Sequence, residues 1–122
     1  MKKKSHIVII IFLTFFLSCN NSEFENKIKG KWVEKTDPTR LFSSATYYFW
    51  PNQKSQYTVT YFGGKSVSGR YEIEKNIVHL FKLNSELKEY EYGNLVIRFI
   101  SDSVFMQGDY RFVKEVGWVE PN

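Results

Sequence analysis

The run QYTVTYFGGKSVSGRYEIEKNIVHLFK, residues 56–82, decides the fold class of this 122-residue chain. It holds three segments in which apolar and polar side chains alternate, a pattern typical of half-buried β-strands. Gly63-Gly64 and Lys75-Asn76 separate the three segments. Two adjacent glycines suit a two-residue hairpin because both can take positive φ at low cost. The run therefore predicts three consecutive antiparallel strands.

The same pattern extends on both sides of this run. One long loop is expected at residues 36–44, and no stretch shows the 3.6-residue period of a helix. In about 95 residues, a meander of short strands favours a small all-β barrel of about eight strands, because closure removes exposed edges. A β-sandwich is the structural alternative. The predicted strands are Ile28–Glu34, Ala45–Trp50, Gln56–Phe62, Ser66–Glu74, Ile77–Lys82, Lys88–Tyr92, Leu95–Ile100, Ser103–Gln107 and Asp109–Lys114.

Composition limits the partners that this chain can have. Three of its four net positive charges come from the three lysines at positions 2–4, so residues 19–122 predict no basic surface for nucleic acid. Phe, Tyr and Trp make up 18% of the chain, which supplies large side chains for a core. The single cysteine excludes an intrachain disulfide, so packing and sheet hydrogen bonds must hold the fold.

The first residues of the chain have the character of a secretory signal. Three lysines precede an apolar run from Ile7 to Leu17, and Ser18 comes directly before Cys19. A basic start, an apolar run of ~7–15 residues and a small residue at the cleavage site define such signals. The apolar run is also shorter than the ~20 residues of a membrane-spanning helix.

The tetrapeptide Phe16-Leu17-Ser18-Cys19 resembles the lipobox of Bacteroidetes lipoproteins. This resemblance implies that residues 1–18 are a lipoprotein signal peptide and that Cys19 is acylated on its sulfur and on its new amino group. Residues 19–27 are then expected to form a flexible tether to a barrel domain at residues 28–122. The implied location is the bacterial envelope, with the outer membrane favoured. The alternatives are a secreted protein with a stray cysteine and an uncleaved anchor.

Gly30-Lys31-Trp32 resembles the Gly-X-Trp opening of lipocalin-like barrels. Further stretches occur in the order and spacing of small bacterial lipocalin-like lipoproteins, and together they span residues 28–114. This resemblance implies a lipocalin-like barrel, and we expect a monomer. The stretches are Tyr48-Phe49 before Pro51-Asn52-Gln53, Gly69–Ile73 leading into Asn76–Leu80, Ile97–Ile100 with Val104 and Met106, and Tyr110–Lys114.

The resemblance also implies how the barrel is closed at one end. In lipocalins an arginine on the last strand covers the tryptophan of the opening motif, and Arg111 lies where that pattern places it, with Arg98 as a weaker candidate. A guanidinium over an indole face stabilises by roughly 0.5–2 kcal/mol. Independently of the family, Gly30 would allow a sharp bend, and Trp32 is large enough to plug a small barrel. The alternative for Arg111 is an ordinary surface position.

The chain offers few groups for catalysis, so we expect neither an enzyme nor a metal or cofactor site. His79 is the only histidine beyond the leader, and Cys19 is assigned to the lipid, so the usual zinc site cannot be assembled. His79 lies between two apolar strand residues and is expected to face solvent. Paired glutamates at positions 72 and 74 and at positions 89 and 91 are typical of a solvated strand face.

The inward-facing positions bear on ligand binding. Such an interior would suit a small hydrophobic molecule, although filling by aromatic rings is the default for so small a barrel. Two functions remain open: binding a small hydrophobic ligand, or docking an envelope protein through the outward aromatics Tyr47 or Tyr48, Trp50, Tyr57 and Tyr61. Alternation predicts these inward residues: Tyr71, Ile73, Val78, Leu80, Tyr90, Tyr92, Val104, Met106, Tyr110 and Phe112.

Overall fold

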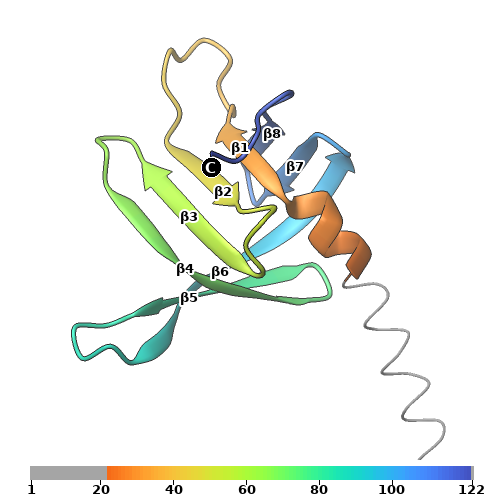
Figure 1. Cartoon of the computed structure of the whole chain (residues 1–122). Helices are drawn as coiled ribbons and strands as arrows, with labels where there is room; N and C mark the ends of the chain where they lie inside the picture. Colours follow the sequence, from red (N-terminus) through yellow and green to blue (C-terminus); the bar gives the residue numbers. More distant parts are fainter. Residues whose placement is uncertain (1–21, 122) are drawn as a thin grey trace, which may run out of the picture.

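The structure is a computed structural model that describes residues 22–121, and this part of the chain forms eight β-strands. Consecutive strands pair antiparallel and β8 pairs with β1, so the sheet closes into a barrel (Figure 1). The predicted all-β barrel is confirmed, and the sandwich alternative is wrong. The predicted signal peptide at residues 1–18 and the predicted acylation site Cys19 lie outside the described residues. The strands are β1 (Gly30–Glu34), β2 (Ala45–Phe49), β3 (Gln56–Tyr61), β4 (Ser66–Glu74), β5 (Ile77–Leu83), β6 (Glu89–Ser101), β7 (Val104–Gln107) and β8 (Tyr110–Lys114).

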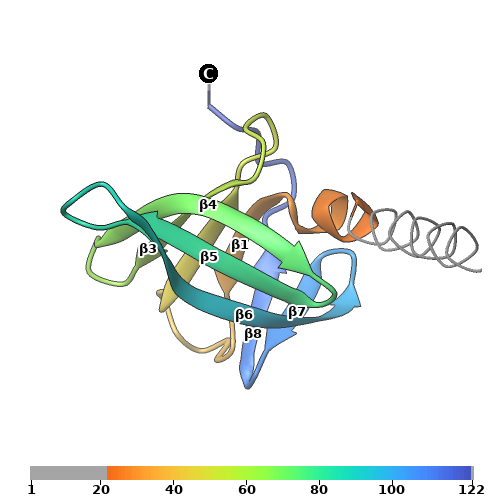
Figure 2. The same cartoon turned by 90° about the horizontal axis from the view of Figure 1, so that it is seen from below.

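The two ends of the barrel are built differently. The β1–β2, β3–β4, β5–β6 and β7–β8 connections lie at one end, which we call the open end. The helix of residues 22–28 and the β2–β3, β4–β5 and β6–β7 connections lie at the other, the closed end. Figure 2 shows the helix on one side of the molecule and the β3–β4 and β5–β6 hairpins on the opposite side.

Residues 22–28 form a helix that packs on the barrel, where the sequence predicted part of a flexible tether. The ring of Phe24 lies 5.1 Å from that of Phe99, and Ile28 is fully buried. Phe24 and Ile28 are four residues apart, so both lie on one face of the helix. That apolar pair in a polar segment is the sequence feature that could have indicated a docked helix.

Strand β6 replaces two strands that the sequence predicted on either side of Gly93-Asn94. Gly93 pairs with Leu80 and Asn94 with His79, so both residues lie inside the ladder. The register then shifts between Leu80 and Phe81, which leaves Tyr92 as the extra residue of a bulge. A glycine within a strand often marks a bulge, and here it does so in place of a turn.

The predicted facing of β7 is wrong. Phe105 is fully buried, whereas Met106 pairs with the exposed residues Arg98 and Arg111 and therefore lies on the outer face, as does Val104. The sequence Val104-Phe105-Met106 is apolar on both faces of a strand. Alternation alone therefore cannot decide which side of this strand faces inward.

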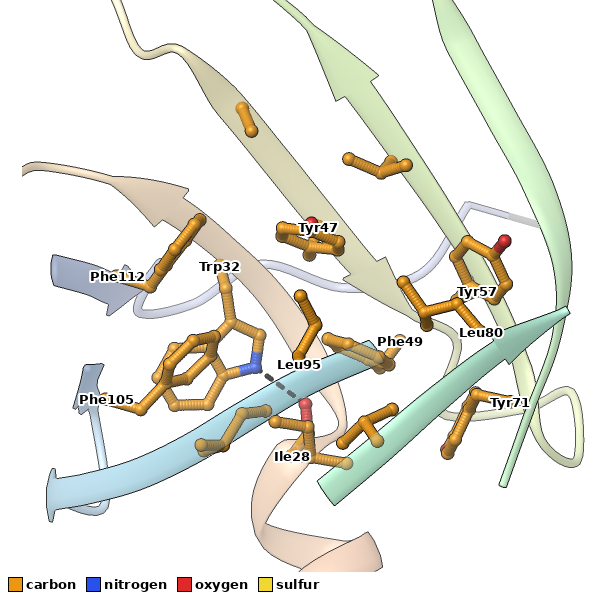
Figure 3. Close-up of a cluster of buried hydrophobic side chains, with 14 of the residues drawn as sticks. Ile28, Trp32, Tyr47, Phe49, Tyr57, Tyr71, Leu80, Leu95, Phe105 and Phe112 are labelled. Carbon is orange, nitrogen blue, oxygen red and sulfur yellow. Dashed lines mark hydrogen bonds between the residues drawn. The ribbon is translucent and has the colours of Figure 1, made fainter. Parts of the chain in front are cut away.

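A chain of aromatic rings fills the closed half of the barrel (Figure 3). The Trp32 ring lies 4.6 Å from Phe105, which stacks on Phe112 at 4.9 Å. Phe49 and Tyr71 continue the contacts on the other side of the interior at 5.3 Å. Because these rings pack directly against aliphatic side chains from the other strands, the expectation of a filled interior holds for this half.

The ladder between β4 and β5 covers only part of β4. It runs from Glu74, opposite Ile77, to Arg70, opposite Phe81, and stops there. The preceding residues Ser66–Gly69 are paired with β3 alone. Figure 1 shows the β3–β4 and β5–β6 hairpins diverging from this point toward the open end. We call this gap between β4 and β5 the seam.

Candidate binding site at the open end

Exposed apolar side chains gather on the connections at the open end. Leu41 and Phe42 belong to the β1–β2 loop, Phe62 to the β3–β4 turn and Leu87 to the β5–β6 turn. Phe42 and Phe62 stack at 4.2 Å, so two neighbouring connections share one apolar surface. We call these four residues the apolar rim. The Phe42–Phe62 contact is clustered exposure, which marks interaction sites more than single exposed residues such as Leu87 do.

A recess opens inside the rim, between the ends of β2, β3 and β8. Its volume is about 220 Å³. Tyr110 was predicted to face inward and does so, on the same side of β8 as buried Phe112, but its ring is about half exposed because it lies at the mouth. The recess is lined by Ser44, Ala45, Tyr47, Tyr61, Gln107, Tyr110 and Phe112.

Tyrosine hydroxyls gather beside the recess. The hydroxyls of Tyr61 and Tyr92 lie 2.9 Å apart and share a hydrogen bond. Burial, with a smaller effect from Tyr92, raises the pKa of Tyr47 to about 12. Burial and the bond to Tyr92 also raise the pKa of Tyr61. These phenols therefore stay neutral at physiological pH and can both donate and accept hydrogen bonds.

Lys82 adds a positive charge to the same mouth. Its Nζ lies 5.0 Å from the centre of the Tyr92 ring and 5.7 Å from that of Tyr90. Tyr90 and Tyr92 were predicted to line the interior, and the structure places both at the mouth, partly exposed. Lys82 was not among the residues predicted to face inward. It is two residues from Leu80 and four from Val78 on the same strand, so it lies on their inward side.

Glu34 holds the loop that carries part of the apolar rim. Its carboxylate accepts hydrogen bonds from the backbone N–H of Thr36 and from the N–H and hydroxyl of Ser44, at the two ends of the loop. Burial alone would raise the pKa of Glu34, but these hydrogen bonds outweigh it and lower the pKa to about 2. The buried carboxylate is therefore charged, and it pins both ends of the β1–β2 loop.

The closed end is plugged as the sequence predicted, but by a different cation. Trp32 is fully buried and its Nε1 donates to the Ile28 carbonyl at 2.6 Å. Lys114 pairs with Trp32 in the ladder, and its Nζ lies 5.2 Å from the indole ring. The prediction for Arg111 is wrong: it lies three residues before Lys114, an odd separation that places it on the exposed outer face. Gly30 takes φ +130°, and a Cβ there would lie 3.0 Å from the Lys114 side chain.

The remaining predicted interior residues are distributed along the barrel. Val78, Leu80 and Phe112 are buried in the core, and Ile73 packs against it. Tyr71 is buried toward the closed end, and its hydroxyl has no hydrogen-bond partner among the described residues. Only the mouth positions therefore remain available to a ligand.

The predicted glutamate pairs lie on the outer face of the barrel, where these glutamates form ion pairs with Arg70 or His79. Arg70 binds both Glu72 and Glu89. His79 Nδ1 lies 2.7 Å from a Glu91 oxygen, and this hydrogen bond raises the pKa of His79. Within residues 22–121, no group of three or more His, Cys, Asp or Glu side chains is placed to hold a metal ion.

Of the aromatic residues proposed to form an outer docking patch, Tyr48 and Trp50 lie together on the outer face and the others do not. Tyr47 and Tyr57 are buried inside the barrel. Tyr48 and Trp50 lie on the outer face, stack on each other at 5.3 Å and are partly covered by Trp118 of the C-terminal segment. Tyr61 lies at the mouth. The rim is therefore the exposed apolar surface beside the recess, and the sequence marked it only by apolar residues in a loop and two turns.

The described helix is not long or apolar enough to cross a membrane. Comparisons of the chain with protein-family models, with curated proteins and with solved structures find no match. The geometry of the open end and the sequence of residues 1–19 are therefore the features that bear on function.

Proposed function

We propose that this protein is a lipid-anchored lipoprotein of the bacterial envelope, most naturally of the outer membrane, whose lipocalin-like barrel binds a small hydrophobic ligand without catalysing a reaction. The observation that carries the proposal is the recess of about 220 Å³ between Tyr47, Tyr61 and Phe112, above the rings that fill the closed half of the barrel. Ligand pockets are commonly about 300–1,000 Å³, so the ligand is small or projects from the recess onto the rim.

The position of the helix supports an orientation in which the closed end lies next to the membrane. The described chain begins at Ser22 at the closed end, three residues after Cys19. Three residues span at most about 11 Å. Acylation of Cys19 would therefore hold the closed end beside the membrane and turn the recess toward the aqueous compartment. Mass spectrometry of protein purified from its native membrane should show the acyl chains on Cys19, and Cys19→Ser should release the protein into the soluble fraction.

Ligand binding can be tested with the neutral fluorescent probe N-phenyl-1-naphthylamine and the full chain in lipid nanodiscs. Ala45 lines the recess, so Ala45→Trp should fill it and abolish the fluorescence gain above that of empty nanodiscs. The matched control is Val96→Trp on the exposed outer face of β6, which should leave binding unchanged. Equal signals from the wild type and Ala45→Trp would overturn the proposal.

Docking of an envelope protein is the second candidate function. The apolar rim favours it, because Leu41, Phe42, Phe62 and Leu87 extend well beyond the recess. Interfaces are enriched in aromatic residues and depleted in charge at their centre. A partner that docks there should dissociate from Leu41→Ser and Phe42→Ser variants yet still bind Ala45→Trp, whereas a small ligand should show the opposite order of sensitivity.

A further inference from the structure

The seam leaves two strand edges without a neighbour in the open half of the barrel. Beyond the pair Arg70–Phe81, β4 continues toward its start as Ser66–Gly69 and is paired only with β3. On the other side, Lys82 and Leu83 continue β5 and are paired only with β6. Closed barrels normally remove such edges, which are templates for another strand.

Neighbouring hydrogen bonds show which backbone groups of β4 face the seam. The Tyr61 N–H donates to the Lys65 carbonyl, and the Tyr71 N–H donates to the Ser55 carbonyl. Antiparallel ladders alternate in direction, so residues 65, 67, 69 and 71 turn their backbone groups toward β3. Ser66 and Ser68 therefore turn theirs toward the seam, where no ladder partner is present among the described residues.

The seam is also a hollow of defined size. Its volume is about 560 Å³, and its walls include Val67, Ser68, Lys82 and Leu83. Gly69 sets its inner limit, because a Cβ at this position would lie 1.8 Å from the Phe81 carbonyl oxygen. The two backbones thus touch at Gly69 and separate beyond it, so the divergence of the hairpins is built into the sequence.

We propose that the seam binds one extended segment of a partner protein, which adds as a strand to the β4 edge at Ser66 and Ser68. An edge of four residues is about 13 Å long and matches four residues of an added strand. An extended backbone supplies N–H and C=O groups at the two-residue spacing that this edge requires. This site is separate from the recess and does not depend on a small ligand.

Charge and burial define the side chains of that segment. Arg70 is neutralised by Glu72 and Glu89, whereas Lys82 has no carboxylate within 4.0 Å among the described residues. The segment should therefore carry a carboxylate that can reach Lys82. Its alternate residues on the inner side should be apolar, because they would lie beside buried Val67.

The geometry favours a single extended segment over a second copy of this chain. The β5–β6 hairpin stands along the other side of the seam, so the β4 edge lies inside a groove (Figure 1). A second barrel that offered its own β4 edge would bring its own hairpin into that groove. It would also bring a second Lys82 toward the first, which like-charge repulsion disfavours.

The test uses the full chain in lipid nanodiscs and a fluorescent, end-blocked peptide Thr-Val-Thr-Val-Thr-Glu, whose Glu lies on the same face of an extended strand as its two Val residues and so on the inward side with Lys82. Ser68→Pro removes the N–H that faces the seam without removing a bond to β3, and edge positions tolerate proline. Ser68→Ala is the matched control, because it keeps that N–H. We expect Ser68→Pro to weaken peptide binding about tenfold or more and Ser68→Ala to leave it within about twofold.

Two further measurements use the wild-type protein and so do not depend on the folding of Ser68→Pro. Two peptides should be compared, one with N-methyl groups on its odd residues and one with N-methyl groups on its even residues. The peptide whose methyl groups replace the N–H groups that face β4 should bind wild-type protein at least about tenfold more weakly than the unmethylated peptide. In the free protein, the amides of Ser66 and Ser68 should exchange faster than those of Val67 and Gly69. No peptide binding at millimolar concentration, equal exchange of the four amides, or a β4-edge dimer that the peptide does not displace would overturn the proposal.

Discussion

The closed end and the open end of this barrel use the same residue types for different purposes. At the closed end, Trp32 is fully buried, its only ring nitrogen is hydrogen-bonded, and Lys114 lies over its face. At the open end, Phe42 and Phe62 also stack, but both rings are more than half exposed. Aromatic content alone therefore does not distinguish a core from a binding surface. What distinguishes them is whether the rings project inside the paired strands or from the connections beyond them.

The two ends differ in strand pairing for a physical reason. At the closed end, the docked helix and the neighbouring strands surround the Trp32 plug, and β4 and β5 are in register. At the open end, β4 and β5 separate beyond Gly69, and Phe42 and Phe62 lie on connections outside the ladder. Stability should therefore reside mainly in the closed end, and truncation of the Trp32 plug there should have the largest effect.

Trp32→Ala should give the largest loss of stability, on the order of 3–5 kcal/mol. The substitution removes a fully buried ring that contacts Phe105 and leaves the Ile28 carbonyl without its donor. The matched control is Trp118→Ala on the outer face, which should cost less than half as much because that ring is only partly buried. Urea unfolding measures both. Equal losses would contradict the assignment of the plug to the closed end.

Glu34→Gln should come next, with a loss of roughly 1–3 kcal/mol at neutral pH, because the amide cannot accept all the hydrogen bonds of the carboxylate. The pKa of Glu34 is about 2 in the folded protein, below its ordinary value of 4.5. Its contribution is therefore complete above pH 4.5 and is lost as the pH falls toward 2.

Urea unfolding between pH 2 and pH 7 checks this dependence. The wild type should lose stability across the acidic range, and Glu34→Gln should lose less, so that the two curves converge near pH 2. Asp109→Asn on the exposed β7–β8 turn serves as the control and should follow the wild type. Parallel curves for the wild type and Glu34→Gln would contradict the role of Glu34 in holding the β1–β2 loop.

Gly69→Ala tests the boundary between the two ends. The added methyl group would meet the Phe81 carbonyl, a backbone atom that cannot move without shifting β5, so we expect a loss of about 1–3 kcal/mol. Gly93→Ala is the matched control, because a Cβ there meets nothing within 4 Å and its loss should stay within about 0.5 kcal/mol. Thermal unfolding compares the two. If Gly69→Ala left the melting temperature unchanged, the two strands could separate further without a cost in stability.

Alternation and turn chemistry were enough to predict the barrel, because strands such as Ser66–Glu74 bury one face and expose the other. They failed where both faces are apolar, as in β7, and where a glycine serves a bulge instead of a turn, as at Gly93. They also could not locate the seam, because β4 alternates normally throughout its length. Its missing partner is a property of β5, which bends away only after the contact at Gly69.

Replacing the cation that covers Trp32 should give the smallest effect on stability. Comparing Lys114→Ala with Arg111→Ala tests the role that the lipocalin resemblance implied for Arg111. Lys114 Nζ lies over Trp32 and donates to the Lys27 carbonyl at 3.1 Å, so it also joins the helix to β8. Burial lowers the pKa of Lys114, which reduces the net gain from the charge. Lys114→Ala should cost roughly 0.5–2 kcal/mol, and Arg111→Ala should stay within about 0.5 kcal/mol.

The fluorescence of Trp32 distinguishes the loss of the cation from a general loss of stability. Lys114→Ala should shift its emission because the charge over the ring is gone, and Arg111→Ala should leave the emission unchanged. Trp50 and Trp118 contribute a background, so both variants are best compared in a Trp50→Phe, Trp118→Phe chain. Arg111→Ala could instead give the larger loss of stability and the larger shift of the Trp32 emission. In that case Arg111 would cap the closed end, as the lipocalin resemblance implied, and its assignment to the outer face of β8 would be wrong.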